Sequence, residues 1–358
     1  MPPPGAHSGE RLRTVPATPR RIRVLCNADW FHTVADRSVE PRRLSGHGVL
    51  ATLRAFWRGR DCDAVVFDNA VRQLLLFCLL RRLLPIGRWK LVSVDPLFSR
   101  PHGFRARLRA RARRWLLGAA DLFILYFRDT AELARLYGIT ADRVRYVPFK
   151  VNQYPQAVAA AVRDEGFILT CGRSHRDYAT FCKAMEGLPY KACIVATLDA
   201  LPEHGTTADF RALCPPNVAV ADHDGSDDSW LDWIAGSTFV VLPISTDALT
   251  CAGISACLLA MALGKCVIIT ESPATRGVLE DGQVITVPSA DVDALRAAIV
   301  AASEDASYRA RIAAAGQRYA RALGDHDRLA QDIVREVVSL VSRQRLERQG
   351  LDVAAPMG

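Results

Sequence analysis

The hydrophobic residues of this chain fall into short continuous runs that alternate with longer amphipathic stretches. The runs are rich in valine, isoleucine and leucine and have apolar side chains on both faces of the pleat, as strands buried on both sides do. In the first half of the chain they predict strands at Arg21–Cys26, Asp63–Phe67, Lys90–Val94, Leu122–Tyr126 and Arg145–Val147. In the second half they predict strands at Phe167–Cys171, Lys191–Ala196, Val218–Ala221, Phe239–Leu242, Cys266–Thr270 and Gln283–Val287.

Helical patterns lie between these runs. They predict helices at Ser45–Trp57, Val71–Leu84, Phe104–Leu117, Thr130–Tyr137, Tyr178–Glu186, Asp228–Ala235, Ser255–Leu263, Val292–Ala302 and Asp327–Arg345. Regular alternation of strand and helix favours parallel sheets with right-handed crossovers. We therefore expect an α/β fold of two Rossmann-like parallel-sheet domains facing a cleft. Because ligands of such sheets lie beyond the carboxyl ends of the strands, we expect the ligand-binding site in the cleft.

The strand–helix pattern restarts after Pro148, which divides the chain in two. The start of the chain is rich in proline and arginine and lacks the apolar core of a signal peptide. The expected organisation is a disordered leader at 1–20, an N-terminal Rossmann-like domain at 21–150, a linker at 151–165, a C-terminal domain at 166–325, and a helix with a tail at 326–358.

Composition narrows the class of protein. The chain has 358 residues, of which 50% are hydrophobic and 23% charged, and these values exclude wholesale disorder. No run of about 18 apolar residues lacks a charge, so a membrane-spanning helix is not expected. The ten cysteines show no C-x-x-C spacing. We therefore expect free core thiols in a cytoplasmic protein, without a disulfide framework or a zinc cluster.

The net charge of +8 is distributed unevenly. Residues 1–150 carry 28 basic and 12 acidic side chains, a balance of +16, and the remainder has a balance of −8. A basic half joined to an acidic half suggests two domains with different partners, and the basic one suits an anionic partner.

The segment Phe104–Leu117 is the most basic part of the chain. Its six arginines surround a stripe of apolar residues at helical spacing that includes Phe104, Leu108 and Trp115. One interpretation is an amphipathic helix on an anionic membrane surface, and the other is a solvated helix over a core stripe. Nucleic acid is not expected as a partner, because aromatic residues are not interleaved with these arginines.

The most specific segment is residues 239–270, which read FVVLPISTDALTCAGISACLLAMALGKCVIIT. A buried strand leads into a polar loop with Asp247 and Thr250, and an apolar helix follows. Gly253 allows the backbone to approach a ligand closely, and Ser255 is placed to cap the helix. The free N–H groups at the helix start suit a phosphate. An ordinary strand–loop–helix unit is the alternative.

This segment resembles the donor-binding region of the large retaining group of GT-B glycosyltransferases. The matching positions are Val241-Leu242-Pro243, Gly253, Ala260-Met261-Ala262, Gly264-Lys265 and Val267-Ile268. Further matching segments, in chain order, are Ala120–Val151, Phe167–Arg173, Asn217-Val218 and Val278–Ile299. The resemblance spans about residues 120–320. It implies the GT-B fold and retaining transfer of a sugar from a nucleotide-diphosphate sugar.

The resemblance also implies how the diphosphate is bound. The family uses the arginine of a Gly-Arg pair and a lysine about five residues later. Here Gly172 and Arg173 form the pair, and Arg176 is the nearest substitute for the lysine. Arginine grips phosphate oxygens through a planar fork and stabilises charge on the leaving group. Surface arginines that pair with Asp177 or Glu186 are the alternative.

The chain departs from the family at its acidic positions. The family has two glutamates eight residues apart, and Leu259 occupies the second position. Asp247 is the expected remaining acid, and Asp95 lies near the place of a family histidine, so these two are the expected catalytic residues. Asp29, at the end of a strand, and His102 are expected on the acceptor side of the cleft.

A metal ion is not expected, since two arginines would serve the diphosphate. The tripeptide Asp222-His223-Asp224 follows a strand, but so short a pattern is more often a solvated acidic loop. The expected protein is a cytoplasmic transferase, peripheral at the inner face of the membrane, without a cofactor besides its donor. The expected acceptor is a glycan, a lipid-linked compound or a small molecule. Two alternatives stay open: a degenerate binding protein without catalysis, and an epimerase or a phosphorylase that uses Lys265.

Overall fold

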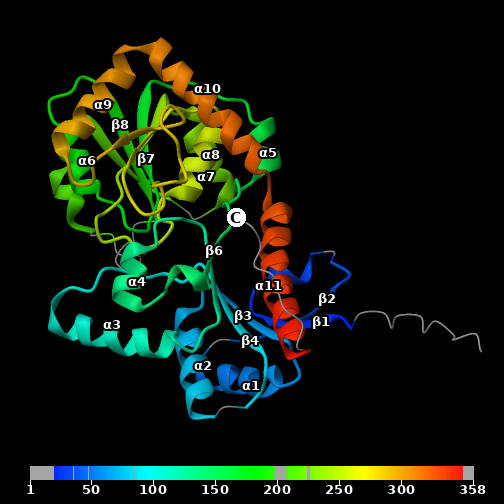
Figure 1. The fold of residues 1–358 in the computed structure, drawn as a ribbon. Helices are drawn as coiled ribbons and strands as arrows, with labels where there is room; N and C mark the ends of the chain where they lie inside the picture. The colour runs from blue at the N-terminus through cyan, green and yellow to red at the C-terminus, as the bar shows by residue number, and fades with distance from the viewer. Residues whose placement is uncertain are drawn as a thin grey trace, which may run out of the picture.

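The computed structural model describes residues 20–34, 36–46, 48–84, 86–197, 206, 208–223 and 226–349. The chain folds into an N-terminal unit and a C-terminal unit, each built on one parallel sheet (Figure 1). The expected α/β fold with two parallel-sheet domains is thus confirmed. Apart from Arg20, the expected leader lies outside the described residues, as does the end of the tail from Gly350.

The sheet of the N-terminal unit has the order β2-β1-β3-β4-β5-β6 in the described chain, with every neighbouring pair parallel. Its strands are β1 (Ile22–Cys26), β2 (Val39–Arg43), β3 (Ala64–Asp68), β4 (Lys90–Val94), β5 (Leu122–Leu125) and β6 (Val144–Tyr146). Strand β2, VEPRR, was not predicted because it is polar and carries Pro41. It lies at the sheet edge, where a proline removes no ladder hydrogen bond.

Helices cover one face of this sheet with aromatic residues. The helical elements are η1 (Asp29–His32), α1 (Val49–Gly59), α2 (Val71–Leu83), α3 (Gly103–Leu117), α4 (Ala131–Tyr137) and η2 (Ala141–Arg143). Phe56 of α1, Phe77 of α2 and Trp89 meet edge to face, with ring centroids 4.9 to 5.9 Å apart. Such contacts add to the burial energy of a core.

The sheet of the C-terminal unit has the order β12-β11-β10-β7-β8-β9 and is also parallel throughout its described strands. These are β7 (Phe167–Cys171), β8 (Lys191–Ala196), β9 (Val218–Asp222), β10 (Phe239–Leu242), β11 (Val267–Thr270) and β12 (Ile285–Val287). The helices around it are α5 (Tyr154–Ala159), α6 (Tyr178–Met185), η5 (Ala208–Leu213), α7 (Asp227–Gly236), α8 (Ile254–Ala262), α9 (Val292–Glu304) and α10 (Ala306–Leu323). The chain's ten cysteines, all described, are free, and eight of them are buried.

The last helix, α11 (His326–Arg348), leaves the C-terminal unit and packs on the sheet of the N-terminal unit (Figure 1). Its residues Ile333, Val337 and Val341 share one core cluster with Val24 and Val92 of β1 and β4. The face of the first sheet that α1 to α4 leave open is covered by this helix. The first core is therefore built from both ends of the chain.

We predict that Ile333→Ala lowers the free energy of unfolding by about 2–5 kcal/mol. Ile333 is 0% exposed between α11 and the sheet, so its removal leaves a cavity. Urea unfolding followed by circular dichroism measures the change. The control is Arg335→Ala on the exposed face of the helix, which removes only a surface ion pair with Asp332 and should cost about 0–1 kcal/mol. Equal losses in the two variants would contradict the packing of α11 on this sheet.

Candidate functional site

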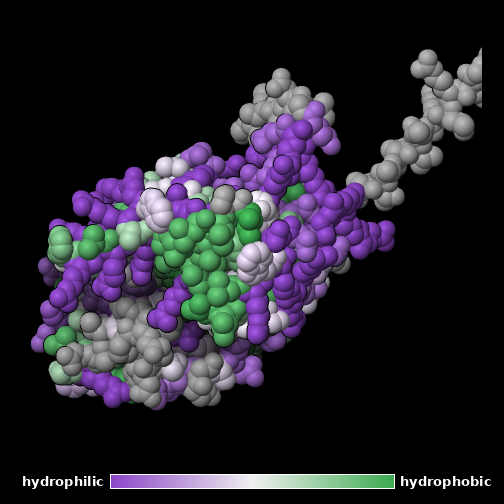
Figure 2. Space-filling model, turned by 90° about the horizontal axis from the view of Figure 1, so that it is seen from below, coloured by the Kyte–Doolittle hydropathy of each residue, from purple (hydrophilic) through white to green (hydrophobic). Residues whose placement is uncertain are grey.

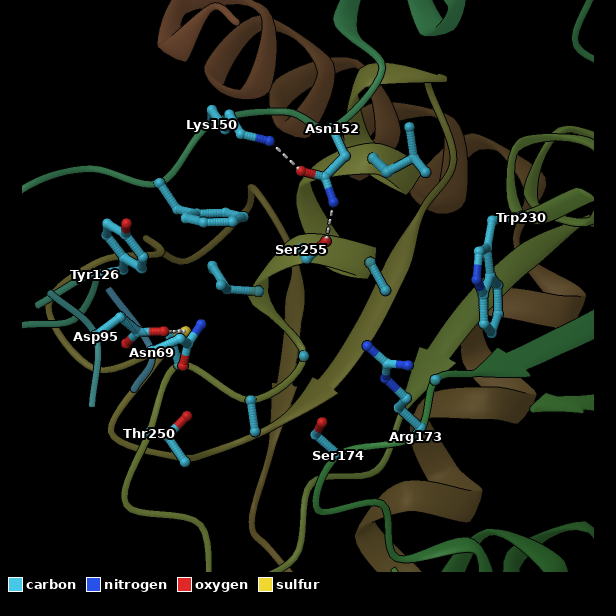
Figure 3. Close-up of a pocket in the computed structure, with 18 of the residues that line it drawn as sticks. Asn69, Asp95, Tyr126, Lys150, Asn152, Arg173, Ser174, Trp230, Thr250 and Ser255 are labelled. Atoms are coloured by element: carbon cyan, nitrogen blue, oxygen red, sulfur yellow. Dashed lines mark hydrogen bonds between the residues drawn. The ribbon is translucent and has the colours of Figure 1, made fainter. Parts of the chain in front are cut away.

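A cavity of about 490 Å³ lies between the two units. The N-terminal unit lines it mainly with residues at or just after the carboxyl ends of its strands, namely Asp68, Asn69, Asp95 and Tyr126. The C-terminal unit contributes the turn after β7, the loop after β10 and the start of α8. Figure 3 shows these side chains converging from opposite sides. In open parallel sheets, ligands bind at this position, beyond the carboxyl ends of the strands.

The turn after β7 presents Arg173 to the cavity. Gly172 has a φ of 111°, and a Cβ at this position would lie 2.4 Å from Nη2 of Arg176, so the turn requires glycine. The Arg173 side chain is exposed and makes no hydrogen bond or ion pair with any described residue. It extends into the cavity (Figure 3). The alternative interpretation, in which Arg173 pairs with Asp177 or Glu186, is therefore wrong.

Arg176 has a different role from Arg173, although it also lines the cavity. It is buried, and its Nε and Nη1 atoms donate hydrogen bonds to the carbonyls of Cys171 and Ser174, each at 2.8 Å. Its backbone N–H donates to Oγ1 of Thr206 at 2.9 Å. The guanidinium is thus held by backbone carbonyls. It fixes the turn that carries Arg173 and adds positive charge beneath it.

Helix α8 points its N-terminus at the same cavity. Gly253, with a φ of 84°, is the N-cap, so the expectation that Ser255 caps this helix is wrong. A Cβ on Gly253 would lie 2.6 Å from the side chain of Ile244, so the loop is closed against the strand end. The first N–H groups of a helix have no partner within it and carry a partial positive charge. The arrangement suits an anion.

A chain of hydrogen bonds crosses from one unit to the other above this helix. Nζ of Lys150 donates to Oδ1 of Asn152 at 2.5 Å, and Nδ2 of Asn152 donates to Oγ of Ser255 at 2.6 Å (Figure 3). Burial lowers the pKa of Lys150, whereas the charges of Asp227 and Asp325 raise it. Lys150 adds a partly buried amine to the guanidinium groups of Arg173 and Arg176 in the cavity lining.

Asp95 is the most deeply placed acid of the cavity lining, which also includes Asp68 and Asp227. It follows β4 with a left-handed φ of 42° and is 3% exposed. Its Oδ2 accepts a hydrogen bond from the Cys251 thiol of the opposite unit at 3.1 Å, while its Oδ1 has no partner among the described residues. Burial raises the pKa of Asp95 to about 7, the Cys251 hydrogen bond lowers it, and the Asp68 carboxylate raises it. A buried, half-satisfied carboxyl in a cavity is a strong candidate for a functional group.

The other expected acids lie outside the cavity lining. Asp247 Oδ1 contacts Nε2 of His102 at 2.9 Å, which joins the two units at an exposed site. Asp29 forms an exposed ion pair with Arg43, with 3.3 Å between its Oδ1 and Nη2 of the arginine. By contrast Leu259, in the place of the family's second glutamate, does line the cavity.

Among the described residues, no group of three or more histidine, cysteine, aspartate or glutamate side chains is arranged to hold a metal ion. Asp224 of the Asp222-His223-Asp224 tripeptide lies outside those residues. Lys265, the lysine considered for a phosphorylase, donates to the carbonyls of Arg163 and Ser237 at 2.6 and 2.5 Å and is not part of the cavity lining.

No protein-family model and no curated protein sequence matches this chain. Solved structures do match its shape. Alr3699/HepE of Anabaena, in complex with UDP and glucose, has a TM-score of 0.64 at 15% identity, over 89% of this chain and 100% of that one. Sucrose-phosphate synthase of Thermosynechococcus elongatus has a TM-score of 0.62 at 16% identity, over 86% and 85%. A glycosyltransferase of Rickettsia africae has 0.61 at 10% identity, over 90% and 99%.

This chain has the GT-B fold. The fold predicted from the sequence is therefore confirmed. Identities this low show the fold alone, so the chemistry of the chain has to be argued from its own residues. In the GT-B arrangement of this chain the cavity between the units collects Gly172, Arg173, Arg176, Thr250 and Gly253.

Sequence reasoning missed several residues of this GT-B cavity. Trp230 of α7 lines it and stacks on His223 with ring centroids 3.8 Å apart. One aromatic residue in an amphipathic helix resembles a core residue, so no signal pointed to it. Lys150 and Asn152 did have a signal, because they lie in the V-P-F-K-V-N segment that matches the family.

We predict that Asp95 makes stability depend on pH. Its pKa rises from 3.8 to about 7 on folding, so the folded chain retains this proton while the unfolded chain releases it. The stabilising contribution is complete below about pH 4 and is lost as the pH rises to about 7, by up to about 1.4 kcal/mol per pH unit. Asp95→Asn should lack this loss. Urea unfolding of both proteins between pH 4 and 8 tests it, and a constant difference between them would contradict the assignment.

Proposed function

We propose that this protein transfers a sugar from a nucleotide-diphosphate sugar to an acceptor. The observation that carries this proposal is Arg173, an arginine without a counter-ion among the described residues that extends into a cavity also lined by the start of α8. A diphosphate bound there meets a guanidinium and a helix N-terminus. When the bond between sugar and diphosphate breaks, the same groups stabilise the negative charge on the leaving phosphate.

The remaining lining gives the donor an orientation. Trp230 offers an aromatic face beyond Arg173, suited to stacking of a nucleobase (Figure 3). On the other side of the cavity, Oδ1 of Asp95 is the acceptor for a sugar hydroxyl. In this proposal Asp95 takes the catalytic contact that the sequence assigned to Asp247, which is bound to His102 outside the cavity.

The donor charge is matched by groups of the chain itself, so we propose transfer without a divalent metal. Retention of configuration follows from the family resemblance. It has a parallel in trehalose-6-phosphate synthase, whose structure was analysed for glycosyl transfer with retention and matches this chain with a TM-score of 0.57. HepE was solved with UDP-glucose, so UDP-glucose is the first donor to test.

We predict that a nucleoside diphosphate or its sugar conjugate raises the melting temperature without added metal, and that Arg173→Ala weakens this binding roughly 10- to 100-fold. A thermal-shift panel of nucleotides, with and without EDTA, measures it. The matched control is Arg318→Ala on α10, an arginine that is also exposed and unpaired among the described residues. Equal weakening in both variants, or no shift from any nucleotide, would contradict the proposed donor site.

An assay for released nucleoside diphosphate, run with the same donors, separates an enzyme from a degenerate binding protein. With the donor bound, wild type should release nucleoside diphosphate slowly to water and faster with an acceptor. Asp95→Asn should still bind the donor, because its amide oxygen also accepts a hydrogen bond, and it should lose this release. Binding without release by wild type, across donors and acceptors, would favour the scaffold alternative.

The N-terminal unit carries an exposed apolar surface that helps to indicate what kind of acceptor the protein uses. Figure 2 shows it on the underside of the molecule, where α1 and α2 lie in Figure 1. The exposed large apolar residues of α1, the end of α2 and α3 are Val49, Leu50, Trp57, Leu83, Leu84, Phe104, Leu108 and Trp115. The interpretation of Phe104–Leu117 as a helix over a core stripe is therefore wrong, because its large apolar residues face outward. This helix instead buries Ala110 and Leu117.

We propose that this surface, the apolar patch of α1 to α3, rests on an anionic membrane and brings the active site to a lipid-linked acceptor. Arginines surround the apolar residues, with Arg60 over the ring of Trp57 and Arg82 over that of Trp115. Apolar side chains beside arginines match the interface of an anionic bilayer. In the part of the chain that is described, no helix is long and apolar enough to span a membrane.

We predict that Leu50→Ser with Trp57→Ser lowers binding to vesicles of phosphatidylcholine and phosphatidylglycerol roughly tenfold or more, because the bilayer no longer buries these side chains. Vesicle cosedimentation measures it, and added salt should weaken the wild type as well. Val158→Ser on α5, an exposed apolar residue of the C-terminal unit, is the control. Wild type that stays in the supernatant at low salt would contradict the membrane proposal.

A further inference from the structure

A second cavity, of about 630 Å³, lies in the N-terminal unit between α3 and α4. We call it the arginine pocket. Its lining residues are Arg100, Pro101, His102, Arg107, Ala110, Arg111, Arg114, Arg135 and Leu136. No acidic side chain lines it, and five of the nine residues are arginines. The five arginines are exposed, and they surround one concave space, where charges of one sign combine to attract an anion.

The arginines of the pocket are only partly neutralised. Glu132 pairs with Arg135 at 2.7 Å and with Arg100 at 3.7 Å. The Arg114 side chain donates to the carbonyl of Arg135 at 2.7 Å. Arg107 and Arg111 make no ion pair or hydrogen bond with any described residue. Two guanidinium groups are therefore available to an incoming anion.

The spacing of these arginines has a cost for the helix. Arg107, Arg111 and Arg114 follow one another at intervals of four and three residues, so they share one face of α3. Like charges at such intervals destabilise a helix. A bound anion would remove the repulsion, and the planar forks of arginine match the oxygens of a phosphate group.

The rim of the pocket touches the loop that serves the first cavity. His102 of the pocket contacts Asp247, and the backbone N–H of Arg100 donates to the carbonyl of Asp247 at 3.1 Å. The same loop continues to Thr250 and Gly253 in the donor cavity. A molecule anchored in the pocket thus lies beside the loop that lines the proposed reaction centre.

We infer that the arginine pocket binds a phosphate group of the acceptor. The inference rests on the proposed function, since it concerns the acceptor of that reaction, and it makes this acceptor a phosphorylated compound. The phosphate is either the headgroup of a lipid or part of a soluble sugar phosphate. Both present the same oxygens to Arg107 and Arg111.

Isothermal titration of the full chain with inorganic phosphate and with glucose 6-phosphate tests the inference. Arg107→Gln with Arg111→Gln should weaken binding at least tenfold. The matched control is Arg105→Gln with Arg109→Gln, which removes the same charge from exposed positions of α3 outside the pocket. Unchanged binding in the control supports the pocket, whereas equal weakening in both double variants overturns it.

Two further arms identify the source of the phosphate and the site that holds it. Vesicles of phosphatidylcholine with added phosphatidic acid report a lipid headgroup, and competition by glucose 6-phosphate reports a soluble acceptor. Either result supports the pocket if it depends on Arg107 and Arg111 and not on Arg105 and Arg109. Loss of phosphate binding in Arg173→Ala would place the ion in the donor cavity and overturn the inference, as would an absence of binding by every probe.

The failure of this inference differs from a failure of the proposed function. If nucleotides bind through Arg173 but no phosphate binds at Arg107 and Arg111, the transferase proposal stands and the inference about the arginine pocket is contradicted. If phosphate binds at the arginine pocket and no nucleotide binds to the protein, the inference about the pocket is supported and the proposed donor site is contradicted.

Discussion

The packing of α11 on the first sheet determines how the rest of the molecule is arranged. The helix follows the C-terminal unit in sequence, yet Ile333, Val337 and Val341 fill the core of the N-terminal unit. The two units are therefore joined twice, once by the chain after β6 and once by α11. With two connections, the carboxyl ends of both sheets are held toward one cavity.

The charged groups of that cavity are of two kinds: some hold the backbone in place, and others have no partner in the protein and can contact a ligand. Arg176 is buried and its hydrogen bonds go to backbone carbonyls, so it is committed to the turn after β7. Arg173 has no such commitment among the described residues. Buried Arg176 thus holds the turn that carries exposed Arg173. Asp95 is divided in a similar way: its Oδ2 accepts a hydrogen bond from Cys251, and its Oδ1 has no partner among the described residues.

Helix α3 carries six of the arginines of the basic N-terminal unit. It contributes to two different surfaces, one apolar and one positively charged. One face of α3 contributes Phe104, Leu108 and Trp115 to the exposed apolar patch. The adjoining side contributes Arg107 and Arg111, which lie three or four residues from those apolar positions, to a cavity. A helix with so little buried surface contributes little to the core, which agrees with a role in binding an anionic partner.

Local patterns were enough to predict the fold and most of its strands and helices, although they missed β2, α5 and α10. Apolar β-branched runs such as those of β3, β10 and β11 give a strong local signal, because strands buried on both faces exclude polar residues. The rule that parallel strands end at one edge predicted the cleft, whereas the choice of Gly172, Arg173, Gly253 and Asp95 came from the family resemblance. Strand β2 escaped because an edge strand tolerates charges and a proline.

Local patterns did not show which way side chains face or which distant segments meet, because both depend on the packing of the whole chain. Asp247 and Asp95 both follow strands, but Asp95 is buried against Cys251, 156 residues away, whereas Asp247 reaches across to His102. The outward orientation of Phe104 and Trp115 and the return of α11 were equally outside local patterns. Periodicity records which residues share a face of an element. Which face meets the core depends on contacts between segments that lie far apart in the chain.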